Sequence, residues 1–271
     1  MNKKIIWAVV IFYVLFFLIF KDIIGAGLTI ALLGVITVIV IVMKRYSIMM
    51  YVALLNVAQG NEKKAKTILE NIIKKGYKSP KVYVYYVNIL LRSGNGLRSK
   101  ELLEEALTLK PDILTYKNIK LCLGSAYWML GDIDSAIYVL ESLREEFEYI
   151  NPFTLTTLGF MYYLNDNLEK AEKISKEAIA DDERNHGAWD NLGQIYLKKG
   201  ESRMAKECFL KALEYKETLV DSLFYLGVIY EAEGNDDEAK AYFIKASNAD
   251  ITSLNTVTKD DIEERLKKFR M

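Results

Sequence analysis

The chain has 271 residues, 51% of them hydrophobic, with 36 basic and 36 acidic side chains and a formal net charge of zero. The region 80–271 is acidic, with 25 basic against 33 acidic residues, and such a surface repels the phosphates of nucleic acids. Only two cysteines and one histidine occur, which argues against a disulfide framework.

Two apolar runs open the chain, at residues 5–20 and 23–43, separated by Lys21 and Asp22. The first run would span roughly 24 Å as a helix, slightly less than a bilayer core of about 30 Å, and the second is long enough. A secretory signal begins in a similar way, but no small-residue cleavage site follows Phe20. We therefore expect a transmembrane helical hairpin over residues 1–45, with spans at 5–20 and 23–43.

The charges that flank the two apolar runs predict the orientation of the hairpin in the membrane. A turn as short as Lys21 to Gly27 places both ends of the hairpin on one side of the membrane. Lys3 and Lys4 precede the first run, and Lys44 and Arg45 follow the second. Because positive charge concentrates on the cytoplasmic side, we expect a two-pass cell-membrane protein with both termini and the soluble region in the cytoplasm.

Small residues recur at a nearly fixed spacing in the soluble region. One series comprises Ala65, Ser99, Ala136, Ala171, Ala205 and Ala239. A second series has identical spacings and comprises Ala53, Val87, Gly124, Gly159, Gly193 and Gly227. Because the two series have the same spacings, they predict a repeat of about 34 residues. The six predicted helix-turn-helix units are 46–79, 80–113, 117–150, 152–185, 186–219 and 220–253. We expect the three extra residues at 114–116 to lie in a loop between units.

The fifth unit matches a known pattern, W-x2-L-G-x2-Y followed by A-x3-F, through Trp189, Leu192, Gly193, Tyr196, Ala205 and Phe209. Over about residues 46–253 the chain thus resembles the tetratricopeptide repeat (TPR) family. The resemblance implies an all-α protein in which two N-terminal transmembrane helices precede a right-handed TPR α-solenoid. Glycines such as Gly131 and Gly200 would end the first helix of a unit in a left-handed turn.

The apolar surfaces at both ends of the solenoid must be covered by capping elements. Thr258 and Asp261 form a capping-box pattern, and Ile262, Leu266 and Phe269 follow as an apolar stripe, so we expect a capping helix within 254–271. At the other end, the second membrane span is expected to continue directly into the first repeat helix at 46–59.

The TPR resemblance also implies a binding surface, because the inner positions of each unit's first helix line the concave face in this family. The candidates for binding a protein or peptide partner are Asn88, Leu121, Ser125, Trp128, Phe153, Thr156, Phe160, Tyr163, Asp190, Gln194 and Phe224. Asp221 falls on the same face. The lining lacks the cations with which some family members clamp a peptide carboxylate. Its aromatic middle and acidic C-terminal end favour an amphipathic helix or an extended segment with some basic character.

The membrane-proximal residues 44–79 carry eight basic and two acidic residues. Their candidate contacts with anionic lipid head groups are Lys44, Arg45, Lys63, Lys64 and Lys66. Alternatively, these basic residues contact no lipid and only reflect the excess of positive charge on the cytoplasmic side of membrane proteins. Both interpretations stay open.

No pattern of a phosphate loop, zinc site or catalytic triad occurs, so we expect no enzymatic activity, metal or cofactor. The favoured function is a membrane-anchored cytoplasmic adaptor that binds a partner helix or peptide in the concave groove. The alternative is a subunit or assembly factor of an integral membrane complex, in which the hairpin contacts partner helices. A third possibility is an enzyme accessory that acts at the lipid surface.

Overall fold

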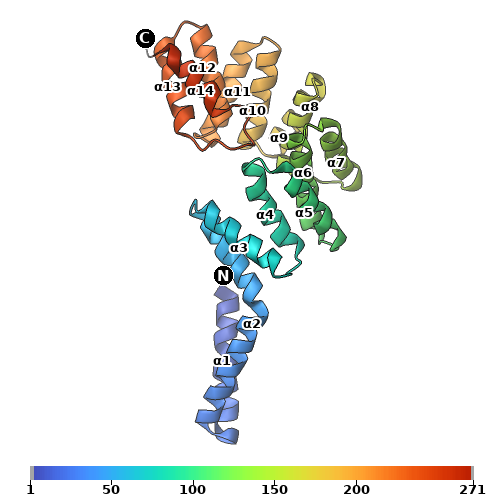
Figure 1. The fold of residues 1–271 in the computed structure, drawn as a ribbon, viewed down its shortest axis with the longest axis vertical. Helices are drawn as coiled ribbons and strands as arrows, with labels where there is room; N and C mark the ends of the chain where they lie inside the picture. Colours follow the sequence, from blue (N-terminus) through green and yellow to red (C-terminus); the bar gives the residue numbers. More distant parts are fainter. Residues whose placement is uncertain (1–2, 270–271) are drawn as a thin grey trace. The chain divides into compact units, whose positions relative to one another are not determined.

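A computed structural model describes residues 3–269, with side chains from residue 11 onward. The described residues form fourteen helices and no strand, as expected for an all-α protein (Figure 1). The chain divides into two compact units, Met1–Tyr77 and Lys78–Met271. Each unit is described separately.

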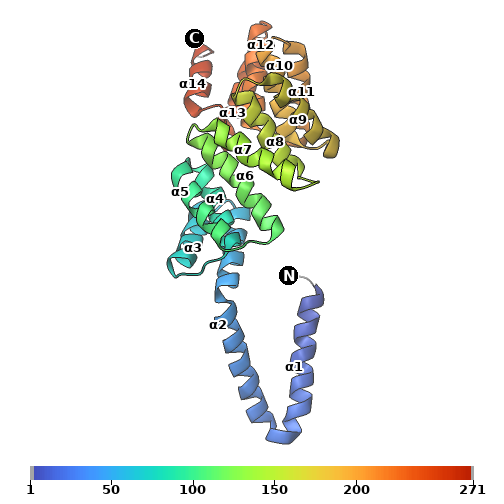
Figure 2. The same ribbon diagram turned by 90° about the vertical axis from the view of Figure 1, so that its right-hand side faces the viewer.

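The first unit holds a helical hairpin and one further helix. Helix α1 covers Lys3–Ile24, α2 covers Ala26–Ala58 and α3 covers Glu62–Lys74. Lys21 and Asp22, expected to interrupt the helix, lie inside α1 instead. A tight turn joins α1 to α2 (Figure 2). The break is at Gly25, whose φ of 85° and ψ of 147° lie in a region open to glycine alone. Helix α1 contacts α2, and the hydroxyls of Tyr13 and Thr37 lie 2.6 Å apart.

Among the described residues, one helix, α2, is both long and apolar enough to cross a membrane. Both predicted membrane spans therefore remain predictions, and α2 alone of the described helices has the length and composition that a span requires. The side chains of Lys3, Lys4 and the rest of the first run up to residue 10 lie outside the described part. From residue 11 to 43, large apolar side chains of both helices are widely exposed, such as Ile23 at 70% and Met43 at 75%.

Helix α2 continues without a break from the apolar run into the first repeat helix, as expected. Ala53 is fully buried in its C-terminal half, and Ala65 and Leu69 of α3 are also fully buried. The helix thus changes along its length from an exposed apolar rod to one half of a packed helix pair.

The second unit consists of five helix pairs and a terminal helix. The pairs are α4 (Pro80–Arg92) with α5 (Gly96–Thr108), α6 (Ile113–Met129) with α7 (Ile133–Glu146), α8 (Pro152–Leu164) with α9 (Leu168–Asp181), α10 (His186–Lys198) with α11 (Ser202–Tyr215), and α12 (Val220–Ala232) with α13 (Asp236–Asn248). Helix α14 covers Lys259–Lys268. The three extra residues at 114–116 lie within α6 rather than in a loop, because Asp112 caps that helix by accepting a hydrogen bond from the Thr115 amide.

Local residue choices explain where these helices begin and end. Asn or Asp side chains cap the starts of most second-unit helices; the Asn151 side chain, for example, accepts from the Thr154 amide at 2.9 Å. Gly131 and Gly200 end first helices at φ of 77° and 80°, as expected for left-handed turns. In the fourth repeat Asp166 takes this position at φ 59°, a conformation that aspartate tolerates better than most residues.

The first helices of successive pairs pack against one another, since α4 contacts α6, α6 contacts α8, α8 contacts α10 and α10 contacts α12. Within each pair, small residues permit close approach to the second helix. Ala136, Ala171, Ala205 and Ala239 are fully buried, and the rings of Phe209 and Phe243 lie against Gly193 and Gly227. The core therefore runs along the seams between and within pairs.

The C-terminal end is closed by α14. Thr258 and Asp261 form the predicted capping box, and Ile262 is fully buried against the last pair, with Leu266 and Phe269 packed beside it. The helix begins only at Lys259, so residues 254–258 do not belong to it. These residues are part of the connection from α13 to α14, an irregular segment at 249–258 that we call the strap.

Candidate partner-binding site

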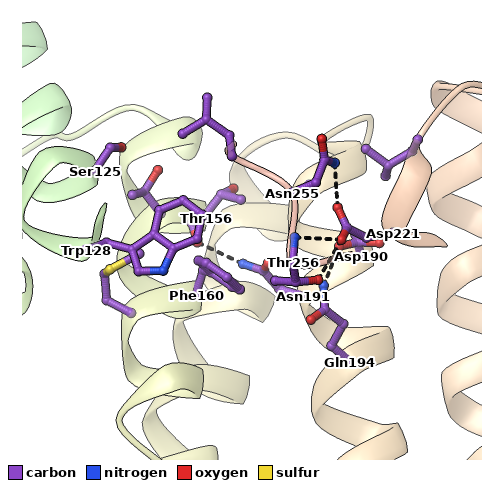
Figure 3. Close-up of a pocket in the computed structure, with 15 residues that line it drawn as sticks. Ser125, Trp128, Thr156, Phe160, Asp190, Asn191, Gln194, Asp221, Asn255 and Thr256 are labelled. Carbon is purple, nitrogen blue, oxygen red and sulfur yellow. Dashed lines mark hydrogen bonds between the residues drawn. The ribbon is translucent and has the colours of Figure 1, made fainter. Parts of the chain in front are cut away.

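A cavity of about 270 Å³ opens among the first helices of the second unit. Helices α6, α8 and α10 form most of its wall, and the strap contributes Leu254, Asn255 and Thr256 (Figure 3). Six predicted groove residues line it, from three consecutive repeats: Ser125, Trp128, Thr156, Phe160, Asp190 and Gln194. The family register thus brings together side chains that are up to 69 positions apart in the chain.

The other five predicted groove residues lie elsewhere. Asn88 is exposed on α4, where it donates to the Val84 carbonyl and accepts from the Cys122 thiol. Leu121 is half-buried beside the core, and Phe153 is 57% exposed at the start of α8. Tyr163 stacks on Phe160 with ring centroids 6.1 Å apart, behind the cavity wall.

Phe224 corrects the prediction, because its side chain is only 8% exposed and belongs to the core of the last repeat. Its ring packs against that of Phe243, with centroids 5.5 Å apart. The repeat register predicts that position 224 faces the concave groove. The phenylalanine ring there is large enough to reach Phe243 on α13, the second helix of the same pair.

One side of the cavity is aromatic. Trp128 of α6 and Phe160 of α8 meet edge to face, with ring centroids 5.3 Å apart and planes at 89°. Both rings are half-buried, so they present apolar surface to a ligand while remaining fixed by their neighbours. This geometry suits an apolar or cationic group.

The opposite end of the cavity is polar and carries two buried carboxylates. Asp190 is 7% exposed, and it accepts hydrogen bonds from the Ser222 hydroxyl and, at 2.8 Å, from the Gln194 amide. Burial, and secondarily the charge of Asp221, raises the pKa of Asp190 to about 7. Asn191 fixes α10 against α8 by donating to the Thr156 carbonyl at 2.8 Å.

Asp221 of α12 anchors the strap. One of its oxygens accepts from the Thr256 amide at 2.8 Å, the Thr256 hydroxyl at 2.5 Å and the Val257 amide at 3.0 Å. Its other oxygen accepts from the Asn255 amide at 2.7 Å (Figure 3). A carboxylate with four donors is held firmly, so this groove position serves the chain itself rather than an outside ligand.

The strap also reaches the first pair of the unit. The Ser253 amide donates to the Arg92 carbonyl at 3.1 Å, and the Arg92 guanidinium lies 2.5 Å from the Asp250 carboxylate. Gly94 permits this approach, because a Cβ there would lie 2.9 Å from the Ser253 hydroxyl oxygen. Sequence reasoning missed the strap, since its segment has no helical periodicity and its partners lie far away in the chain.

The five predicted lipid contacts belong to the first unit, where the structure separates them. Lys44 and Arg45 are exposed on α2, and the Arg45 guanidinium lies 4.6 Å from the centre of the Tyr46 ring. Lys63, Lys64 and Lys66 lie at the start of α3, which follows the far end of α2, roughly 20 Å along the helix from Lys44.

The C-terminal end of α3 lies closer to Lys44 and Arg45 than its N-terminal end does. Tyr46 stacks on Tyr77 with ring centroids 4.7 Å apart, which brings the segment containing Lys74 and Lys75 beside α2. Lys74 and Lys75 are therefore nearer than Lys63, Lys64 and Lys66 to the ring contact beside Lys44 and Arg45.

No cluster of three or more His, Cys, Asp or Glu side chains able to hold a metal ion occurs in the described part of the chain. Cys122 and Cys208 are both buried free thiols, and burial raises the pKa of each to about 12.

Comparisons with known proteins agree on the repeat. A family model described as the cilia and flagella-associated protein 70 middle TPR-like domain matches residues 155–263. Human cilia- and flagella-associated protein 70 is 27% identical over 106 residues, which cover 39% of this chain and 10% of that protein. Response regulator aspartate phosphatase E of Bacillus subtilis (strain 168) is 27% identical over 129 residues, covering 44% of this chain and 34% of that protein. The chain thus spans 10% and 34% of the length of these two relatives.

A solved structure covers more of the chain. The crystal structure of a tetratricopeptide repeat protein from Parabacteroides merdae ATCC 43184 aligns with a TM-score of 0.69 at 16% identity, and covers 94% of this chain and 95% of that one. At this identity the likeness establishes the fold. Together, the 34-residue spacing, the stacked helix pairs and these matches show a TPR-like fold, and the family model matches a TPR-like domain at residues 155–263.

Proposed function

We propose that this chain is a membrane-anchored adaptor that captures a protein partner through the cavity among α6, α8 and α10, without catalysis of its own. The observation that carries the proposal is the convergence of six inner-face side chains on one cavity. An aromatic wall faces a polar end there, which is the division that peptide-binding surfaces use for anchoring and orientation.

The shape of the cavity favours an extended segment over a helix. Leu254, Asn255 and Thr256 of the strap form part of its lining, and Asp221 holds the strap in place. A helix of about 10 Å diameter would need the strap to move away, whereas an extended segment can insert single side chains beside it.

Membrane attachment rests on the first unit. Its exposed apolar side chains along residues 11–43 would be costly in water, and α2 has the length and composition of a membrane span. We place both termini and the repeats in the cytoplasm on the basis of Lys44 and Arg45, which follow the span. The same two residues, with Lys74 and Lys75, are the proposed contacts with anionic lipid head groups.

Loss of the aromatic wall tests the adaptor function. The double variant Trp128→Glu with Phe160→Glu should lose its partners in in-cell crosslinking followed by mass spectrometry, because two carboxylates would replace the apolar anchor surface. Helical content measured by circular dichroism should be close to that of the native chain, since both rings are only half-buried.

The matched control replaces two exposed apolar side chains on second helices, Leu97 at 62% and Tyr138 at 75% exposure, with glutamate. This control should keep the crosslinked partners. If the cavity variant retains them as well, the binding surface lies elsewhere.

A further inference from the structure

The polar end of the cavity contains an acceptor atom with no partner. Gln194 is 4% exposed, and its amide nitrogen donates to Asp190. Its carbonyl oxygen has no hydrogen-bond partner among the described residues. A buried amide oxygen without a donor costs free energy. Gln194 is one of the residues that line the cavity (Figure 3), so a ligand there can supply the missing donor.

The charges at this end are also unbalanced. Asp190 and Asp221 are each 7% exposed, and no salt bridge within the described part of the chain includes either of them. The donors to Asp190 are a neutral hydroxyl and a neutral amide. Buried carboxylates are usually paired with a cation. The strap satisfies Asp221, and Lys216 acts on Asp190 through its charge without forming an ion pair in the described part of the chain, so Asp190 is the carboxylate left for a cation from outside.

The aromatic wall complements this negative end. Trp128 and Phe160 line the same cavity as Gln194 and Asp190, and their ring faces and edges are suited to the methylenes and the charge of a long cationic side chain. A cavity of about 270 Å³ has room for one such side chain, and no cluster in the described residues favours a metal ion instead.

We propose that this cavity binds a lysine or arginine side chain of a partner segment. The cationic head donates to the carbonyl oxygen of Gln194 beside the Asp190 carboxylate, and the aliphatic stem lies against Trp128 and Phe160. This inference rests on the adaptor function proposed above and names the residue type that the partner must present.

Protonation of Asp190 should make the affinity for a cation depend on pH. The pKa of Asp190 is raised to about 7, so its carboxylate becomes charged as the pH rises from 6 to 8. The titratable or charged groups around it are Asp221 on α12, Lys216 before α12, Tyr163 on α8 and Tyr225 on α12. Burial raises the pKa of both tyrosines above the ordinary value for a phenol, so Asp190 is the group that changes over this range and binding of a cation should strengthen with rising pH.

The test uses the full-length protein in detergent micelles, labelled with ¹⁵N at tryptophan. Four blocked pentapeptides that differ only at a central Lys, Arg, norleucine or Glu are titrated, and the indole signal of Trp128 is followed. The Lys or Arg peptide should shift this signal at a concentration about tenfold lower than the norleucine peptide, because a charged donor meets an unpaired acceptor. The Glu peptide should not bind.

Two cavity variants remove the features that recognise the cation. Gln194→Met keeps the shape but lacks the acceptor, and Asp190→Asn lacks the charge; each should weaken binding of the Lys peptide by about tenfold and reduce the discrimination against norleucine. Asp190→Asn should also remove the pH dependence. The charge-matched control is Asp237→Asn, an exposed acid on α13, which should leave binding unchanged.

Three results would overturn the inference in distinguishable ways. Equal binding of the Lys and norleucine peptides would remove the preference for a cation but keep the groove as a peptide site. A shift of Trp128 by none of the peptides would contradict the adaptor function together with the inference. Binding of free n-butylammonium as tightly as the Lys peptide would assign the cavity to small amines rather than to a partner protein.

Discussion

At the scale of single residues, close contact within the helix pairs of the last four repeats depends on a glycine in the first helix. A Cβ added at Gly193 would lie 2.5 Å from a ring carbon of Phe209, and one at Gly227 would lie 2.6 Å from a ring carbon of Phe243. Both rings are fully buried. In the fourth repeat, a Cβ at Gly159 would meet the hydroxyl of Ser175 at 2.8 Å instead.

These contacts predict different costs for the same substitution. Gly193→Ala and Gly227→Ala should each destabilise the protein by about 1–3 kcal/mol, because a buried ring has no room to move away. Gly159→Ala should cost less, since a serine hydroxyl can rotate. Thermal unfolding of full-length variants followed by circular dichroism would measure the three side by side, and an equal loss at Gly159 would contradict the packing argument.

At the scale of elements, the strap is the feature that distinguishes this solenoid from a plain stack of helix pairs. It is held at two points, by Asp221 near α14 and by Arg92 of α4. The Arg92–Asp250 pair is substantially exposed, with side chains 37% and 79% accessible, so it contributes only about 0–1 kcal/mol. Asp221 contributes more, because its hydrogen bonds are buried and charged.

Hydrogen exchange at the strap tests this ranking. Arg92→Glu or Asp250→Arg should raise the exchange rate of the Ser253 amide by about fivefold at most, and the double charge reversal should restore the native rate. Asp221→Asn should raise the rates of the Thr256 and Val257 amides by about tenfold or more. If the double reversal exchanges faster than either single variant, the ion pair does not hold the strap.

At the scale of the whole molecule, attachment to the membrane is the property on which the proposed role depends. A cysteine placed at Asp237, which is exposed on α13, reports the location of the repeats, because the two native cysteines are buried. An impermeant maleimide should label Asp237→Cys only after the cells are lysed, and the protein should stay in the membrane pellet at alkaline pH. Labelling on intact cells would place the repeats outside.

Much of the fold followed from local patterns in the chain. The two series of small residues predicted the stacked helix pairs because small side chains at those positions are needed wherever helices approach closely. Thr258 and Asp261 predicted their capping box because such a cap depends on residues three positions apart. Six cavity residues were named from the repeat register alone, since equivalent positions of stacked helices face the same side.

Other features were beyond the reach of the sequence. Phe224 was expected in the groove, but the space beside Phe243 accommodates its ring, and only the packed pair shows that space. The grouping of Lys74 and Lys75 with Arg45 depends on how α3 folds back along α2. The break at Gly25 rather than Lys21 arises because polar residues can continue a helix, whereas a backbone at φ 85° and ψ 147° requires glycine.

The amino-acid sequence by itself determined the helical repeats, their spacing and the long apolar segment ahead of them, because these depend on spacing within about one helix turn or one repeat. The tertiary structure alone decided the route of the strap, the burial of Asp190 and the unpaired oxygen of Gln194. Those features arise where side chains more than 30 positions apart meet, as Ser222 meets Asp190 and Ser253 meets Arg92, and no local pattern in the chain records such a meeting.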